Sequence, residues 1–201
     1  MVAAAAALAL CLLPAAAPAA HRAGGTRAAC PKAWAKGWLA LAKKVQAPVY
    51  CPTWMPNPLD GHIGGEWQDI YSIGKDRSYL VGFLYHGEGA SGDVHVNFRG
   101  YPGRTRIPRC RIVVPMSAGK IRNGIGPCFA DPRGRTKANG ITATVYTVNQ
   151  DADQWHVLLA WRRAGTLYTV SEHVIRPYNF SHVVKNLDAL LRGLVLVRPA
   201  R

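Results

Sequence analysis

Apolar positions near the start of the chain recur at the spacing of an α-helix. Trp34, Trp38, Leu41 and Val45 lie three or four residues apart, and Pro31 before them suits a first helical turn. The pattern predicts an amphipathic helix of about fifteen residues whose two tryptophans pack into the core.

A second helical pattern closes the chain. Ser181 has the hydroxyl group of a favourable N-cap, and Gly193 marks the expected end of the helix. One face carries an apolar stripe that we expect to be buried, made of Val183, Val184, Leu187, Leu190, Leu191 and Leu194.

Between these helices the pattern is that of extended chain. Prolines at 48, 52, 56 and 58 exclude a regular helix and predict an extended strap anchored by Tyr50, Trp54 and Met55. Runs of β-branched and aromatic residues follow, and short turns separate several of them, as in an antiparallel sheet. The predicted strands are 67–73, 79–86, 94–98, 111–114, 141–148, 155–162 and 167–175. Segments 100–108 and 115–139 are rich in glycine and proline and should be irregular.

The last two predicted strands define their own register. A two-residue turn at 164–165 predicts three cross-strand pairs: Trp161 with Tyr168, Leu159 with Val170 and Val157 with Glu172. One face should then be buried, and it carries Trp155, Val157, Leu159, Trp161, Tyr168 and Val170. The same register places His156 opposite His173 on the face away from the core.

The first twenty residues carry no charge, and an apolar run from Val2 to Leu13 precedes a stretch of alanine and proline. This is typical of a secretory signal peptide that is cleaved near 17–19 or just after Ala20. Retention as an anchor is the alternative, since twenty uncharged residues can span a bilayer. Pro14 and Pro18 would interrupt such a helix. We therefore expect a signal peptide over 1–20 and a single secreted or extracytoplasmic α+β domain over 21–201, in which a curved antiparallel sheet packs against an N-terminal and a C-terminal amphipathic helix.

Four cysteines follow the predicted signal peptide: Cys30, Cys51, Cys110 and Cys128. In an oxidising compartment they are disulfide candidates, although the sequence permits three pairings. Pairing between neighbours, Cys30–Cys51 and Cys110–Cys128, is the favoured interpretation. A zinc site is disfavoured because the chain has no Cys-x-x-Cys pair.

Composition adds a strong positive charge. The chain has 25 Lys and Arg against 11 Asp and Glu, a formal net charge of +14. Between positions 99 and 137 there are ten basic residues, and Asp131 is the one acid among them. Such a segment attracts polyanions and anionic membrane surfaces, or it forms only a solvated basic face. The anion-binding candidates are Arg104, Arg106, Arg109, Arg111, Arg133 and Arg135.

Histidines and acids form three small groups with weaker chemical signals. These are His156 with His173; His86, Glu88, Asp93 and His95 around a glycine-rich turn; and Asp60 with His62. Each holds residue types that bind metals or transfer protons, but none matches a recognised spacing, and no Gly-x-Ser-x-Gly elbow is present. We interpret them as ordinary polar positions, and we assign no metal, cofactor or catalytic residue.

The strap resembles a motif of known proteins. The stretch Tyr50-Cys51-Pro52-Thr53-Trp54-Met55-Pro56 is similar to the Tyr-x-Pro-x-x-Leu-Pro strap of secreted bacterial domains of unknown function. Those domains resemble the extracytoplasmic domains of anti-sigma-factor proteins and, distantly, periplasmic lipoprotein carriers. Trp161-x-x-x-Gly165-x-x-Tyr168 before a leucine-rich helix is similar to their usual ending. The resemblance implies helices across the concave side of a curved sheet, and the carriers hold acyl chains between these layers. Asn57-Pro58 in place of a glycine, the four cysteines and the basic segment depart from the pattern.

Two classes of function follow. The favoured class is a non-enzymatic binding or envelope-associated protein. Its partner would be a lipid or other apolar ligand, or else an anionic envelope polymer or membrane surface; no specific nucleic acid partner is expected. The residues that would line an apolar site are Trp34, Trp38, Trp155, Trp161 and Tyr168. The alternative class is a small secreted hydrolase with His62, His86 or His95 as its base.

Overall fold

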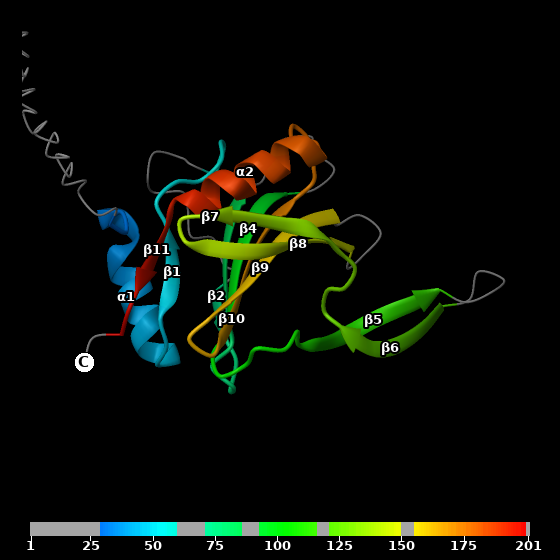
Figure 1. Ribbon diagram of the computed structural model, residues 1–201, viewed down its shortest axis with the longest axis horizontal. Helices are drawn as coiled ribbons and strands as arrows, with labels where there is room; N and C mark the ends of the chain where they lie inside the picture. Colours follow the sequence, from blue (N-terminus) through cyan, green and yellow to red (C-terminus); the bar gives the residue numbers. More distant parts are fainter. Residues whose placement is uncertain (1–28, 60–70, 86–92, 116–120, 150–154, 200–201) are drawn as a thin grey trace, which may run out of the picture.

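The computed structural model describes residues 29–59, 71–85, 93–115, 121–149 and 155–199 (Figure 1). Within these ranges the elements are α1 (Lys32–Val45), β1 (Val49–Pro52), β2 (Tyr71–Ile73), β3 (Tyr79–Tyr85), β4 (Val94–Tyr101), β5 (Arg109–Pro115), β6 (Ile121–Pro127), β7 (Pro132–Ala138), β8 (Ile141–Asn149), β9 (Trp155–Arg163), β10 (Thr166–His173), α2 (Phe180–Arg192) and β11 (Leu194–Val197). The predicted signal peptide, Asp60, His62, His86 and Glu88 lie outside the described residues, as does most of the predicted strand 67–73.

The centre of the fold is a seven-stranded antiparallel sheet in the order β2-β3-β4-β10-β9-β8-β7. Two smaller antiparallel pairs, β1 with β11 and β5 with β6, complete the described strands. The main core lies between one face of the large sheet and a layer made of α1, the β1–β11 pair and α2 (Figure 1). The predicted combination of antiparallel sheet and two helices is confirmed, but the described chain has more strands than the seven predicted.

Helix α1 forms as its hydrophobic period predicts. Pro31 precedes the first turn, and the helix ends at Gln46, whose φ of 52° reverses the chain. The buried ring of Trp38 meets Phe98 edge-on at a centroid distance of 5.8 Å, and Trp34 meets Phe83 at 5.3 Å. These contacts attach α1 to strands β3 and β4 of the sheet.

The strap after α1 is extended, as its prolines predict, and β1 pairs with β11 beside the sheet. The buried ring of Tyr50 lies between Tyr168 at 4.9 Å and Trp161 at 5.3 Å, with both contacts edge-on. The Tyr168 hydroxyl donates to the Pro48 carbonyl at 2.8 Å. Tyr50 anchors the strap as predicted. Trp54 does not, because its side chain is 41% exposed.

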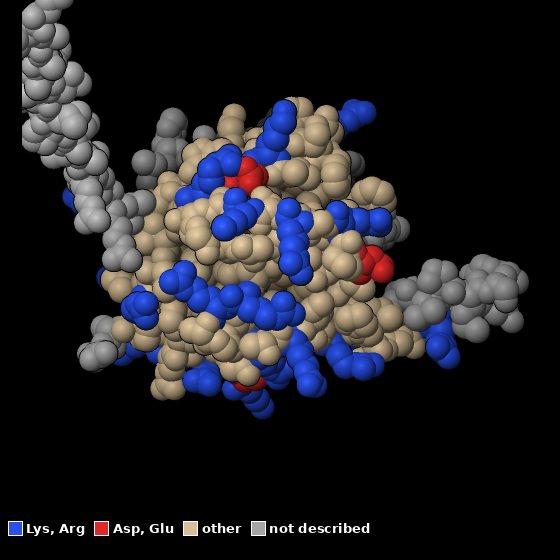
Figure 2. Space-filling model, in the orientation of Figure 1, with Lys and Arg blue, Asp and Glu red and all other residues tan. Residues whose placement is uncertain are grey.

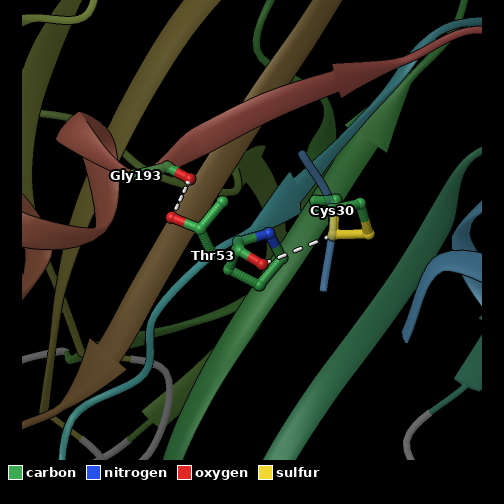
Figure 3. Close-up of a disulfide and its surroundings, with 5 residues drawn as sticks. Cys30, Thr53 and Gly193 are labelled. Atoms are coloured by element: carbon green, nitrogen blue, oxygen red, sulfur yellow. Dashed lines mark hydrogen bonds between the residues drawn. A yellow bond between two sulfur atoms is a disulfide. The ribbon is translucent and has the colours of Figure 1, made fainter. Parts of the chain in front are cut away.

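Two links hold the strap to both helices (Figure 3). The predicted Cys30–Cys51 disulfide ties Cys30, two residues before the start of α1, to β1. The Thr53 hydroxyl donates at 2.8 Å to the carbonyl of Gly193, directly after α2, and the Thr53 backbone N–H donates to the same oxygen at 3.0 Å. The strap therefore joins the start of the described fold to its closing helix.

The β9–β10 hairpin has the predicted register. Ala164 and Gly165 both have positive φ, 46° and 75°, as a two-residue hairpin turn requires. The three predicted pairs and the His156–His173 pair all occur. One residue of the predicted buried face is misplaced: Trp155 is 57% exposed, because it lies at the first position of β9, where the strand begins.

Helix α2 differs from the prediction at its start. The N-cap is Asn179, whose Oδ1 accepts from the His182 backbone N–H at 3.1 Å, and Ser181 is already inside the helix. The Ser181 hydroxyl donates to Asn179 instead, at 2.9 Å. Along the predicted apolar stripe, Val184 is 37% exposed, while the members buried within α2 are Val183, Leu187, Leu190 and Leu191.

One segment predicted to be irregular, 115–139, contains two strands. Residues 121–127 pair with β5, and residues 132–138 form the edge strand β7 beside β8. The glycines, prolines and charged residues of these strands obscure the alternation of apolar and polar positions that would predict a strand. The strands form nevertheless, because the hydrogen bonds between paired strands use backbone groups only. The strand β11 was also missed, because its four residues follow directly on α2. Within the described ranges, no helix has the length and apolar character needed to cross a bilayer.

Candidate functional site: a histidine pocket and a basic surface

Three histidines lie side by side on the sheet face that is turned away from the helices. The register of β9 and β10 places His156 opposite His173. On the other side of β10, Glu172 is opposite Val96, so the adjacent residue His95 lies beside His173. The ring centroids are 4.8 Å apart for His95–His156, 4.8 Å for His95–His173 and 5.1 Å for His156–His173. We call these residues the histidine cluster.

Hydrogen bonds define the tautomers in the neutral cluster. The backbone carbonyl of Asp93 lies 3.0 Å from Nδ1 of His95 and 2.8 Å from Nδ1 of His173. A carbonyl only accepts, so both Nδ1 atoms carry a proton. The Nε2 atom of neutral His95 is then an acceptor, and His156 donates to it across 2.7 Å.

Burial makes a charge on His95 costly. Burial lowers the pKa of His95; the hydrogen bond to the Asp93 carbonyl opposes this change, and the neighbouring His173 adds to it. Among the described residues, no group of three or more His, Cys, Asp or Glu side chains is arranged to hold a metal ion. The arrangement is a group of three imidazoles in ring contact at the edge of a hollow, with a hydrogen bond between His95 and His156.

The hollow next to the cluster has a volume of about 370 Å³. The register explains its shape: Gly82, Asn97 and Ser171 are consecutive partners across β3, β4 and β10, so two small residues flank Asn97. Larger side chains stand around them. The lining residues are Leu80, Leu84, Asp93, His95, Asn97, Arg99, Val148, His156, Leu158 and Ser171, and we call this hollow the histidine pocket.

Two polar groups of the pocket stand out. The Oδ1 atom of Asn97 is buried and has no hydrogen-bond partner among the described residues. Arg99, two residues further along β4, is half-buried, and its guanidinium interacts with the Tyr101 hydroxyl. Burial raises the pKa of Tyr101, and the Arg99 guanidinium acts against that rise. The pocket thus combines an unsatisfied acceptor with a fixed positive charge.

The second feature is the charge of the folded surface. Four of the 25 basic residues and six of the 11 acidic ones lie outside the described ranges, which leaves 21 bases and five acids within. Glu172 is buried, and two of the other four acids form ion pairs, Asp76 with Arg104 at 3.0 Å and Asp188 with Arg192. Figure 2 shows a face on which Lys and Arg far outnumber Asp and Glu.

All six predicted anion-binding arginines are exposed. Arg104 and Arg106 lie between β4 and β5, Arg109 and Arg111 lie on β5, and Arg133 and Arg135 lie on β7. We call these six residues, together with Arg122 of β6, the basic surface. The part on β5 and β6 belongs to a hairpin that projects from the body of the fold (Figure 1).

The projecting hairpin carries charge on both faces. Arg111 pairs with Ile125, whose side chain is 58% exposed, and Arg109 donates to the Ile125 carbonyl at 2.8 Å. Arg122 lies opposite Val114 on the other face. The predicted Cys110–Cys128 disulfide closes the base of the hairpin. Cations on an extended two-stranded arm can approach a polymer from more than one side.

The residues predicted to line an apolar ligand do not come together in one pocket. Trp34, Trp38, Trp161 and Tyr168 are at most 3% exposed and pack into the main core, whereas Trp155 lies outside it. A cavity between the sheet and α2, beside Val157 and Leu187, has a volume of about 110 Å³. Ligand pockets usually measure about 300–1,000 Å³.

Sequence reasoning missed two features of the site. The His156–His173 pair followed from one turn, but adding His95 requires knowing that β10 also pairs with β4. For Glu172, the sequence predicted only that it pairs with Val157 across the hairpin. In the structure its side chain is fully buried, and Oε1 accepts a hydrogen bond from Asn186 of α2 at 2.7 Å. Burial raises the pKa of Glu172 to about 8, although the Asn186 hydrogen bond opposes the rise.

No model of a protein family matches the chain, and neither curated proteins nor solved structures show a significant similarity to it. The proposals below therefore rest on the chain's own geometry.

Proposed function

We propose that this protein is an extracytoplasmic binding protein that attaches to an anionic polymer of the cell envelope through its basic surface. The observation that carries the proposal is the imbalance of 21 bases against five acids in the described fold. The potential of such a surface concentrates polyanions near it and speeds their association. The two disulfides fit an oxidising compartment outside the cytoplasm.

The filled space between sheet and helices favours a polymer over an apolar ligand. Four of the five aromatic residues considered for an apolar site already contact core neighbours, so a ligand there would have to displace packed side chains. A polymer on the outside needs no such rearrangement. The alternative of a hydrolase with His95 as its base gains no support, because the two ring nitrogens of His95 contact the Asp93 backbone carbonyl and His156, and neither contacts a described hydroxyl or carboxylate side chain.

Binding to immobilised polygalacturonate and to linear polyphosphate tests the proposal, with dextran as the uncharged control. We expect both polyanions to bind, dextran not to bind, and the logarithm of the binding constant to fall linearly with the logarithm of salt concentration. Binding that is absent at 50 mM salt, or that salt does not weaken, would contradict the proposal. Binding to phosphatidylglycerol vesicles but to neither polymer would assign the surface to membranes instead.

Two triple variants with the same loss of charge locate the surface. R109Q/R111Q/R122Q removes three cations from the projecting hairpin, and K36Q/K43Q/R198Q removes three from α1 and the residue after β11. Figure 1 places these groups at opposite ends of the molecule. We expect the hairpin variant to lose about tenfold or more in affinity and to show a shallower salt slope. Equal losses in both variants would mean that net charge alone attracts the polymer.

A further inference from the structure

We propose that the histidine pocket binds one unit of a hydroxylated anion, either a sugar acid or a polyol phosphate. This inference rests on the proposed function, because such a unit is what an anionic envelope polymer would present. The pocket is separate from the exposed arginines on which that function depends. It would select the polymer by its chemistry, whereas the basic surface would attract it by charge.

Asn97 sets the first requirement on the ligand. Its Oδ1 is a buried acceptor without a described partner, and leaving such a group unpaired costs free energy of folding. Because Oδ1 itself is closed to solvent, a bound hydroxyl group would donate to it once the side-chain amide turns toward the pocket, and the bond would remove that cost. Ser171, directly opposite Asn97 on β10, adds a hydroxyl that can donate or accept.

Arg99 sets the second requirement. It is the pocket's permanently charged cation, and its guanidinium presents a planar fork of donors to a carboxylate or phosphate. Asp93 and the histidine cluster lie toward the other end of the β4 face, since Asp93, His95, Asn97 and Arg99 are alternate residues of the chain. A ligand with an anionic group at one end and hydroxyls along its length matches this order.

The walls of the pocket set its width. Leu80 and Leu84 of β3 stand on one side, and Leu158 and Val148 stand on the other. These apolar side chains suit the carbon skeleton of a sugar or polyol between them. The volume of about 370 Å³ lies at the lower end of the range for small-molecule sites, which suits one or two units and not a folded macromolecule.

Titration of the full-length protein with small probes tests the inference. The probes are D-glucuronate and glycerol 3-phosphate, with glucose and acetate as controls that lack the charge or the hydroxyls. Binding is followed by calorimetry and by the NMR shifts of the histidine imidazole protons. We expect at least one anionic probe to bind at least tenfold more tightly than either control and to shift the signals of His95 and His156.

Variants assign the binding to the pocket. N97L removes the acceptor and R99Q removes the charge, and each should weaken the binding of the anionic probe at least tenfold. R135Q, an exposed change on β7 outside the pocket lining, is the matched control and should leave binding of the probe unchanged. If N97L fails to fold, R99Q decides the outcome, because its half-exposed side chain is not part of the core.

The outcomes separate this inference from the proposed function. Selective binding of glucuronate identifies a sugar acid, and selective binding of glycerol 3-phosphate identifies a polyol phosphate. Two results would overturn the proposal that the pocket binds this ligand: no NMR shift with either probe at 20 mM, or binding that N97L and R99Q leave intact. Either result would do so even if the protein still binds polyanions in a salt-dependent manner. Binding of the probe without retention on either polymer would support the pocket and contradict the proposed function.

Discussion

The Nε2 atoms of His95 and His156 lie 2.7 Å apart, although strand β10 lies between the strands that carry them. Neighbouring strands in a sheet are about 4.8 Å apart, so both side chains must lean across β10 to meet. They meet beside His173, the residue of β10 in the same row. The contact links β4, β10 and β9 on the face opposite the helices, and it needs at least one neutral imidazole.

Acid should therefore destabilise the protein through His95. Because burial lowers its pKa below the ordinary 6.5, the unfolded chain takes up a proton at a higher pH than the folded chain does. The contribution of His95 is fully present above about pH 6.5 and is lost as the pH falls through the folded pKa. Urea unfolding at pH 7 and pH 5 measures the difference. H95Q should reduce the difference, and an unchanged difference in H95Q would contradict the prediction.

Glu172 should give the opposite dependence. Its pKa is raised to about 8 from an ordinary value of 4.5, so the folded state holds a proton that the unfolded state has released. Its stabilisation is present below about pH 4.5 and is lost as the pH rises toward 8, by a few kcal/mol in all. We expect the free energy of unfolding to fall between pH 6 and pH 9 in the wild type and to change much less in E172Q. A parallel decline in both proteins would show that other groups cause it.

Asn179 and not Ser181 should determine the stability of the first turn of α2. The Asn179 side chain accepts the His182 backbone N–H, a bond that N179A removes. Loss of such a cap costs about 1 kcal/mol. S181A removes only a hydroxyl that donates to the cap, so it should cost a few tenths of a kcal/mol. Chemical denaturation measures the free energy of unfolding of both variants. A larger loss of stability in S181A than in N179A would mean that Ser181 is the N-cap, as the sequence suggests.

Gly100 should not tolerate even a methyl group. A Cβ atom at this position would lie 2.2 Å from Cε1 of the buried Tyr79 ring, its cross-strand partner on β3. We expect G100A to destabilise the fold by about 1–3 kcal/mol, because the ring must move out of a packed core. G126A is the control: the added Cβ would meet the flexible Cδ1 of Ile112 on the hairpin, at 2.6 Å. Equal midpoints for G100A and the wild type in thermal unfolding would disprove the clash.

Local pattern alone determined a large part of this fold. The apolar period around Trp34 and Trp38 predicted α1, and the 164–165 turn predicted the complete register of β9 and β10. The favoured pairing of neighbouring cysteines is confirmed, although the sequence permits three pairings. These features depend on residues close in sequence, where a repeat of 3.6 or 2 residues directly reflects which side faces the core.

Which distant segments meet depends on long-range packing. Strands β6, β7 and β11 are held by backbone hydrogen bonds to partners, and such bonds leave little trace in side-chain type. The place of β4 beside β10 brings His95 to His156 and forms the pocket around Asn97. Likewise, the packing of α2 buries Glu172 and supplies Asn186 to it. The residue pattern along the chain accounts for both helices, the β9–β10 hairpin and the excess of positive charge, and long-range strand pairing places the polar side chains where they converge.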